Sequence, residues 1–150
     1  MKNNSNEFQN KLVDPYVGIG FALELLKASP YHRDKELGAY FRSQILQPLT
    51  IKQIKFYTTM DGLPCGMIVW ARISEEVRRE IHLTGRSLSS NEWSCGKHVF
   101  INDFIDMANN SRAMIRDMMS NVVPDAEIAS SLRRNSDGSV RKVNRWSRRL

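Results

Sequence analysis

The sequence predicts a single mixed α/β domain in which a sheet is flanked by helices. Its 150 residues are an ordinary length for one domain. With 41% apolar and 25% charged residues, the composition is that of a globular protein. The order of periodic segments is helices, hairpin, helix, strand, helix and strands, which is typical of a layered α/β architecture. We expect residues 1–15 to form a polar lead and residues 16–150 to form the domain, with a basic C-terminal segment.

Two helices are predicted in the first third of the chain. Apolar residues at helical spacing predict a helix from Val17 to Lys27. Ser29-Pro30 should end it, because proline disfavours helical backbone at the residue before it. A second helix is predicted from Arg33 to about Leu46, closed by Pro48.

A β-hairpin and a capped helix follow. Residues 52–59 are rich in β-formers, residues 65–73 are an apolar run, and Asp61-Gly62 between them is a strong turn signal. Ser74 can cap a helix with acidic residues in its first turn, where the helix dipole favours negative charge. We expect that helix to end near Gly85.

The last third of the chain predicts a strand, a helix and a second hairpin. Residues 99–105 alternate, which places Val99, Ile101, Asp103 and Ile105 on one face of a strand. A methionine-rich amphipathic helix should begin at Ser111. Residues 126–133 and 139–142 flank Asn135-Ser136-Asp137-Gly138 and predict the final hairpin.

The positive charge of the chain is concentrated at its C-terminal end. The net charge is +6, and residues 133–150 hold seven basic residues against one acidic residue. The first 132 residues therefore sum to zero. A basic end on a neutral body favours an anionic partner such as nucleic acid, an acidic protein or a membrane surface. The alternative is a solvated tail that keeps the protein soluble.

Several classes of protein are disfavoured. No apolar run approaches the length of a membrane span, and residues 1–10 lack the apolar core of a secretory signal. Cys65 and Cys95 cannot form a disulfide scaffold or a four-ligand zinc site, so we expect a reducing, cytoplasmic setting. His82 and His98 have no metal-ligand spacing. We expect neither a metal nor a bound cofactor.

Two residues are candidates for chemistry. Asp103 lies among branched aliphatic residues, and a buried carboxylate needs a partner, so it either makes a structural hydrogen bond or orients a catalytic group. His32 follows a helix end, where its ring nitrogens are available for proton transfer at neutral pH. The alternative for His32 is a surface or capping histidine.

Two weaker candidates have simpler explanations. Cys95 could be a nucleophile, but it lacks a histidine at a recognised spacing, so a plain small residue is favoured. The methionine-rich helix, with Met107, Met114, Met118 and Met119, could line an acyl-chain pocket, since methionine adapts to irregular apolar shapes. More often such a stripe is core.

The motifs together resemble a known family. Ala28-Ser29-Pro30-Tyr31-His32-Arg33 resembles the Ser-Pro-x-His element of the RTX toxin-activating lysine acyltransferases, the haemolysin C-like family. Further matching segments follow in family order, from about Phe21 to Trp146: residues 45–49, 61–66, 69–76, 92–97 and 100–105. One departure follows the strand, where the family often has Asp-x-Ile-Ala-Pro-Phe-Gly and this chain has Asp103-Phe104-Ile105-Asp106-Met107-Ala108-Asn109.

The resemblance implies a GNAT-like acyltransferase fold and a specific reaction. Family members move a fatty acyl group from acyl carrier protein to internal lysine ε-amines of an RTX protoxin. The implied catalytic pair is His32 and Asp103, with Ser29 in a supporting role, and the implied assembly is a homodimer. The basic end then acquires a use as part of a dock for the acidic carrier, through Arg133, Arg134, Arg141 and Lys142.

Three alternatives are kept beside this interpretation. The first is a small nucleic-acid-binding module, which would need aromatic residues among the basic ones, where only Trp146 occurs. The second is an acetyltransferase that uses an acyl-CoA, which usually brings a glycine-rich turn for the pyrophosphate that this sequence lacks. The third is an inactive relative, suggested by the altered segment after Asp103.

Overall fold

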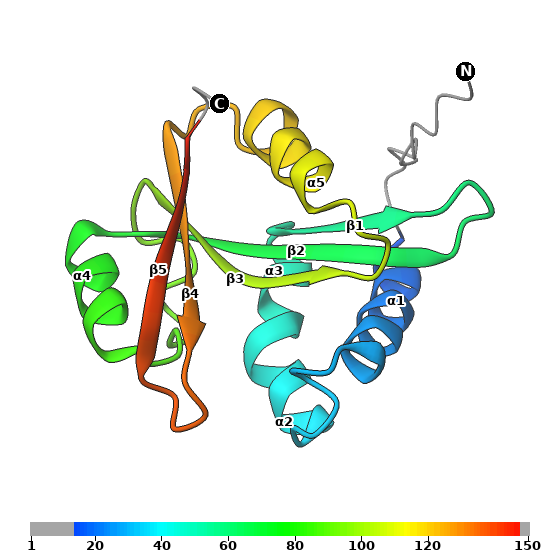
Figure 1. Ribbon diagram of the computed structural model, residues 1–150, viewed down its shortest axis with the longest axis horizontal. Coiled ribbons are helices and arrows are strands. Elements are labelled where there is room, and N and C mark those ends of the chain that lie inside the picture. The colour runs from blue at the N-terminus through cyan, green and yellow to red at the C-terminus, as the bar shows by residue number, and fades with distance from the viewer. Residues whose placement is uncertain (1–13, 148–150) are drawn as a thin grey trace.

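One mixed sheet organises the molecule (Figure 1). The computed structural model describes residues 14–147. The strands lie in the order of the chain, and every neighbouring pair is antiparallel except β3 and β4, which are parallel. The strands are β1 (Ile54–Thr58), β2 (Pro64–Ile73), β3 (His98–Asp106), β4 (Ile128–Arg134) and β5 (Val140–Ser147).

Helices cover both faces of this sheet. On one face lie α1 (Pro15–Ala28), α4 (Glu75–Thr84) and a helical segment between them in sequence. This segment consists of α2 (Leu37–Tyr40), η1 (Phe41–Ile45) and α3 (Leu46–Thr50). On the other face lie α5 (Ser111–Asp117) and η2 (Met118–Val122), which make the crossover between the parallel strands (Figure 1). None of the helices within residues 14–147 is both long and apolar enough to cross a bilayer.

The first helix is confirmed and the second is shifted along the chain. α1 ends at Ser29 as predicted. The next helix begins at Leu37 rather than Arg33, because tight turns occupy the intervening residues and the Glu36 carboxylate caps Gly38 and Ala39. Pro48 does not close this segment, and that prediction is wrong. It is the third residue of α3, which follows directly on the π-helical turn η1 and continues to Thr50. An irregular turn of this kind is one way in which a helix accommodates a residue that has no backbone N–H.

The predicted hairpins and the capped helix are confirmed. β1 pairs with β2 across the Asp-Gly turn, and β4 pairs with β5 across the Asn135–Gly138 turn. The Ser74 side chain accepts from the Val77 N–H at the start of α4, and Gly85 ends that helix with φ 73°, a left-handed conformation that glycine adopts readily.

The predicted face of β3 is wrong because the strand contains a β-bulge. Val69 of β2 pairs with Asp103 and the next residue pairs with Ile101, so Asn102 is an extra residue. The alternation therefore reverses at this point. Val99 and Ile101 face α5, whereas Asp103 lies on the opposite face, where the cluster containing Ile105 packs against α1 and η1.

The parallel pair β3–β4 is short, and this opens the sheet. Only Val99 with Ala129 and Phe100 with Ser130 are in register. Beyond these pairs the strands diverge, and Figure 1 shows β4 and β5 running steeply across the direction of β2 and β3. The sheet is therefore split at its centre on the side where Asp103 lies.

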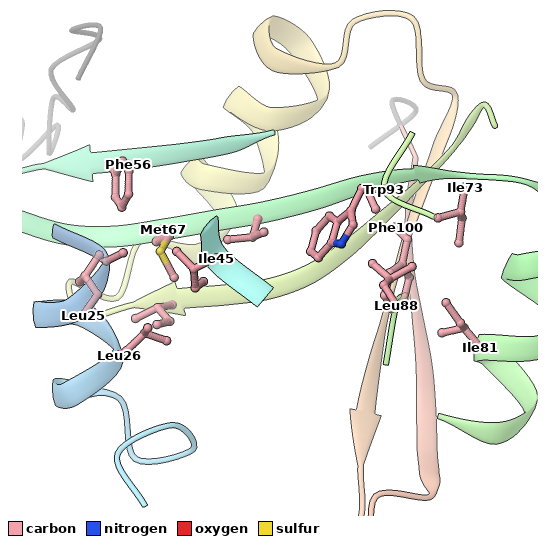
Figure 2. Packing of buried hydrophobic residues seen from close by; sticks show 14 residues of the cluster. Leu25, Leu26, Ile45, Phe56, Met67, Ile73, Ile81, Leu88, Trp93 and Phe100 are labelled. Atoms are coloured by element: carbon pink, nitrogen blue, oxygen red, sulfur yellow. The ribbon is translucent and has the colours of Figure 1, made fainter. Parts of the chain in front are cut away.

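The apolar core divides between the two faces. Leu25 and Leu26 of α1 lie beneath β2 and β3 beside Met67, while Trp93, Leu88 and Ile81 fill the other end of the same face (Figure 2). The opposite face is filled largely by the helix of residues 111–122. Both clusters anchor β3, so the strand that carries Asp103 is held on both sides.

Candidate active site

His32 is fixed by a tight turn directly after α1. The Ser29 carbonyl accepts from the backbone N–H groups of His32 and Arg33, at 3.1 and 2.9 Å. The His32 carbonyl accepts in turn from Lys35. These bonds form because Pro30 ends the helix and the chain then reverses. The imidazole is buried, with 4% of the residue exposed, so it is not a surface or capping histidine.

His32 meets Asp103 across 71 positions of sequence. His32 Nε2 lies 2.7 Å from Asp103 Oδ1, and Asp103 is 5% exposed. The β-bulge at Asn102 turns the carboxylate toward α1, while the turn after α1 presents the ring. A buried carboxylate is costly without a partner, and the imidazole provides one.

The partners of the ring determine its tautomer. A carboxylate only accepts hydrogen bonds, so Nε2 of the neutral ring carries the hydrogen. Nδ1 is then the basic nitrogen, and Ser29 Oγ lies 2.7 Å from it. The Ser29 hydroxyl therefore donates to Nδ1 in the neutral state. The result is a hydrogen-bonded chain from Ser29 through His32 to Asp103, which is the arrangement that activates a proton acceptor.

Tyr40 completes this chain, and the sequence analysis missed its role. Its hydroxyl donates to Asp103 Oδ2 at 2.6 Å. Burial, followed by the charge of Asp103, raises the pKa of Tyr40 far above its ordinary value, so the phenol keeps its proton and remains a donor. The sequence signals only an apolar helical position, because tyrosine fits the stripe of Leu37, Phe41 and Ile45 equally well.

A broad cleft of about 1530 Å³ reaches this hydrogen-bonded chain. It occupies the split between β3 and β4, and Ser29, His32 and Asp103 line it. Apolar side chains line another part of it, namely Ile101, Phe104, Ile115, Met119 and Trp146. The volume exceeds the roughly 300–1,000 Å³ of common small-molecule sites, so the cleft has room for a ligand larger than these sites hold.

The cleft is strongly basic. The four predicted docking residues, Arg133, Arg134, Arg141 and Lys142, all line it. Arg112, Arg116 and Arg145 line it as well, and the sequence analysis did not select them. Their helical and strand spacing gives no sign that they face the same space. Against these seven cations, Asp103 is the one carboxylate among the described lining residues. Arg148 and Arg149 of the basic end lie outside the described residues.

The other candidates do not join this site. Cys95 is exposed, and its Sγ contacts the backbone of Ser74 and Glu92. His82 and His98 both lie within hydrogen-bond distance of the buried Ser130 hydroxyl. Among residues 14–147, no three histidine, cysteine or acidic side chains gather in a way that could hold a metal.

The methionines divide between core and cleft. Met114 and Met118 are completely buried in the core, whereas Met119 lies at the edge of the cleft. Met107 precedes the helix and is half exposed.

The altered segment after β3 is a well-formed turn. The Asp106 carboxylate accepts from the Ala108 N–H at 3.0 Å and from the Ser111 hydroxyl at 2.6 Å. Asn109 adopts φ 56°, which asparagine tolerates better than most residues. The added acid therefore closes the turn into α5, and the segment leaves the His32–Asp103 contact intact.

Comparison with known proteins identifies the fold and the family of this chain. A GNAT-family acetyltransferase from Listeria monocytogenes superposes with a TM-score of 0.54, covering 91% of this chain and 83% of that one at 7% sequence identity. The fold is therefore the GNAT-like α/β fold. Residues 16–147 match the family model for HlyC, the RTX toxin acyltransferase family, and the chain belongs to that family.

Curated relatives carry names that agree with this assignment. The lysine-acyltransferase RtxC of Vibrio cholerae is 28% identical over 104 residues, which are 69% of this chain and 67% of that protein. The protein-lysine palmitoyltransferase CyaC of Bordetella bronchiseptica is 25% identical over 134 residues, 89% of this chain and 71% of that one. Acyl transfer and lysine acylation are thus supported at the level of the family.

Proposed function

We propose that this protein transfers a fatty acyl group from an acyl carrier protein to lysine ε-amines of an RTX protoxin. The single observation that carries the proposal is the buried His32–Asp103 pair, 2.7 Å apart, at the side of a large basic cleft. The names of the relatives support a lysine acceptor and a fatty acyl group, since one is a lysine acyltransferase and one a protein-lysine palmitoyltransferase.

The reaction needs a base, and we assign that role to His32. A lysine amine has a reference pKa of ~10.4 and is almost fully protonated at neutral pH, so it must lose a proton before it attacks a thioester. A positioned imidazole typically contributes on the order of 10²–10⁴-fold. Asp103 accepts a hydrogen bond from the Nε2–H group and stabilises the imidazolium that forms. The imidazolium then returns this proton to the departing thiolate, and the second proton that the nitrogen loses on becoming an amide passes to water.

Ser29 is proposed as the proton relay between substrate and ring. Its hydroxyl lies 2.7 Å from His32 Nδ1. As Ser29 Oγ takes a proton from the amine, the hydroxyl therefore passes its own proton to His32. The same geometry would suit a nucleophilic serine. Intact mass spectrometry of the enzyme with donor alone separates the two roles. A relay leaves the enzyme mass unchanged, whereas a nucleophile adds one acyl group that Ser29→Ala removes.

The donor is proposed to be a carrier protein because of the charge and the shape of the cleft. Acyl carrier proteins are strongly acidic, and seven cations line the cleft. The turn between β3 and α5 contains no glycine, so it lacks the usual cradle for the pyrophosphate of a CoA. The apolar side chains along the same cleft would receive the fatty chain. A cytoplasmic location and a homodimeric state stay predictions, to be tested by cell fractionation and sedimentation.

The decisive experiment is intact mass spectrometry of a candidate RTX protein incubated with acyl-acyl carrier protein and this enzyme. We expect one acyl mass per modified lysine, and none with His32→Ala. A parallel reaction with acyl-CoA should be much slower. Equal acylation by the His32→Ala variant would remove the proposed base, and equal rates with acyl-CoA would remove the carrier.

A further inference from the structure

The large cleft has a closed inner end and an open outer end. β3 and β4 are paired through Val99 with Ala129 and Phe100 with Ser130, and they diverge beyond these pairs. The inner end of the cleft therefore lies beside the paired residues, and the outer end lies where the strands are furthest apart. The chain must return from the end of β3 to the beginning of β4, so α5 and η2 run from the outer end toward the inner end (Figure 1).

One face of the helix of residues 111–122 borders the cleft, and its character changes along its length. Arg112, Ile115, Arg116 and Met119 line the cleft at spacings of three and four residues, which form one stripe of a helix. Because the helix runs inward, Arg112 lies outermost and Met119 innermost. Met119 is 4% exposed and belongs to the hydrophobic cluster on this face of the sheet. This wall is therefore cationic toward the outer end and apolar toward the inner end.

The wall formed by β4 and β5 changes in the same way. Arg133 is paired with Lys142 near the turn of the hairpin, and both line the cleft. Trp146 lines it at the other end of the hairpin, where it is paired with Ala129, a residue that joins β4 to β3. Trp146 is half-buried and packs against the same hydrophobic cluster as the methionine-rich helix. Both walls thus place cations at the outer end and a large apolar side chain at the inner end.

The reacting groups lie between the two ends. Ile101 is the first residue of β3 beyond the paired segment, and it lines the cleft on the same face of the sheet as Met119. Asp103 follows two residues later on the strand and binds His32. A thioester at His32 therefore has the cations on its outer side and the apolar end of the cleft on its inner side. A carrier protein is too large to enter and stays outside, so the acyl chain points inward.

We infer that the inner end of the cleft limits the length of the acyl chain, because the end of the chain abuts Met119 and Trp146. The inference rests on the proposed function and adds to it the residues that select the donor by length. A chain that is too long meets the closed end before its thioester reaches His32. A chain that is too short leaves apolar surface of the two side chains in contact with water, which weakens its binding.

Binding of unreactive probes tests this without any acyl transfer. The probes are S-alkyl thioethers of pantetheine with saturated chains of about 8 to 18 carbons, and the readout is isothermal titration calorimetry. Affinity should rise about fourfold with each added methylene group while the chain still has cleft to fill, and it should stop rising at one length. Met119→Trp should lower this limit by about two carbons or more, because indole reaches further into the cleft. Trp146→Leu should raise it, because most of the ring is removed.

A second methionine of this chain provides the matched control. Met107 precedes the helix, is half exposed and lies outside the described lining of the cleft. Met107→Trp makes the same change of side chain and should leave the length limit where it is. Thermal unfolding shows which variants fold. Trp146 is only half-buried on a strand at the edge of the sheet, so Trp146→Leu provides the test where Met119→Trp does not fold.

The transfer assay reads the same limit in the product. The enzyme is offered an equimolar mixture of acyl carrier proteins with chains of different length, and the mass added to the protoxin shows which chain was used. We expect Met119→Trp to shift the product toward shorter chains and Trp146→Leu to shift it toward longer ones.

An unchanged length limit in either folded variant would overturn the inference, and it would leave the acyl transfer reaction untouched. The same conclusion would follow if Met107→Trp moved the limit as far as Met119→Trp. Conversely, a shifted limit for the probes without transfer to any protoxin would sustain the inner end as the site of the chain and refute the proposed reaction.

Discussion

Asp103→Asn changes one atom of the proposed active site and removes its negative charge. In the folded protein Asp103 Oδ1 lies 2.7 Å from His32 Nε2, and both residues are at most 5% exposed. If base catalysis forms an imidazolium there, its charge is about 4 Å from that of the carboxylate. At an effective dielectric constant of about 20, that attraction is about 4 kcal/mol. At about 1.4 kcal/mol per tenfold in rate, we expect kcat to fall roughly a thousandfold.

The assay is the rate of acyl addition to the protoxin, followed by intact mass, beside thermal unfolding of each variant. Asparagine has nearly the shape of aspartate and no charge to bury, so the unfolding temperature should not fall. Asp106→Asn is the matched control, since it lies three residues further along the same strand and binds Ser111 rather than His32. A kcat within tenfold of the unsubstituted enzyme would refute the role of Asp103 as the group that stabilises the imidazolium.

Three further predictions concern charge, pH and packing. Neutralising the four basic residues predicted as the dock should raise KM for the carrier about tenfold or more, and the effect should shrink in 0.5 M salt; an unchanged KM would exclude the dock. Burial, followed by the charge of Arg78, lowers the pKa of His98 to about 4. Between pH 6.5 and 4 the unfolded chain binds more protons than the folded one, so the free energy of unfolding falls on acidification across that window. The expected loss is about 1–2 kcal/mol after discounting for solvent screening. Urea unfolding of His98→Gln should lose that pH dependence. Gly96→Ala should destabilise the fold by several kcal/mol in the same assay, because its Cβ would lie 2.3 Å from the Ile73 carbonyl oxygen, and a normal unfolding midpoint would contradict that contact.

Residue chemistry alone selected His32 and Asp103 as separate candidates. That the two form a pair was predicted only from the resemblance to the family. Periodicity placed Asp103 on a strand and His32 after a helix end, and both placements are confirmed. Nothing in the alternation of residues 99–105 signals the bulge at Asn102, because the extra residue is itself polar and fits the pattern. The strand assignment was therefore right and the face assignment wrong.

Other parts of the site depend on the third dimension alone. Tyr40 and Asp103 are 63 positions apart, and the helix that carries Tyr40 begins four residues later than the apolar pattern suggests. Arg112 and Arg116 belong to a solvated helix face by their spacing. They line the site only because β3 and β4 diverge and α5 borders the gap. Backbone irregularities and strand divergence have no short-range signature, whereas caps, turns and helix ends do.

Two irregularities of the same strand produce both halves of the site. The register of β3 with β4 ends at Phe100, and the bulge in its pairing with β2 follows two residues later. The first opens the cleft, and the second turns Asp103 out of the face of Ile101 and toward His32. Regular pairing on both edges would close the cleft and point the carboxylate at α5, away from the imidazole. Strand β3 must therefore be rigid enough to hold a buried carboxylate and irregular enough to aim it. The two hydrophobic clusters supply the rigidity. One cluster packs on each face of the strand, and each includes residues before and after the bulge.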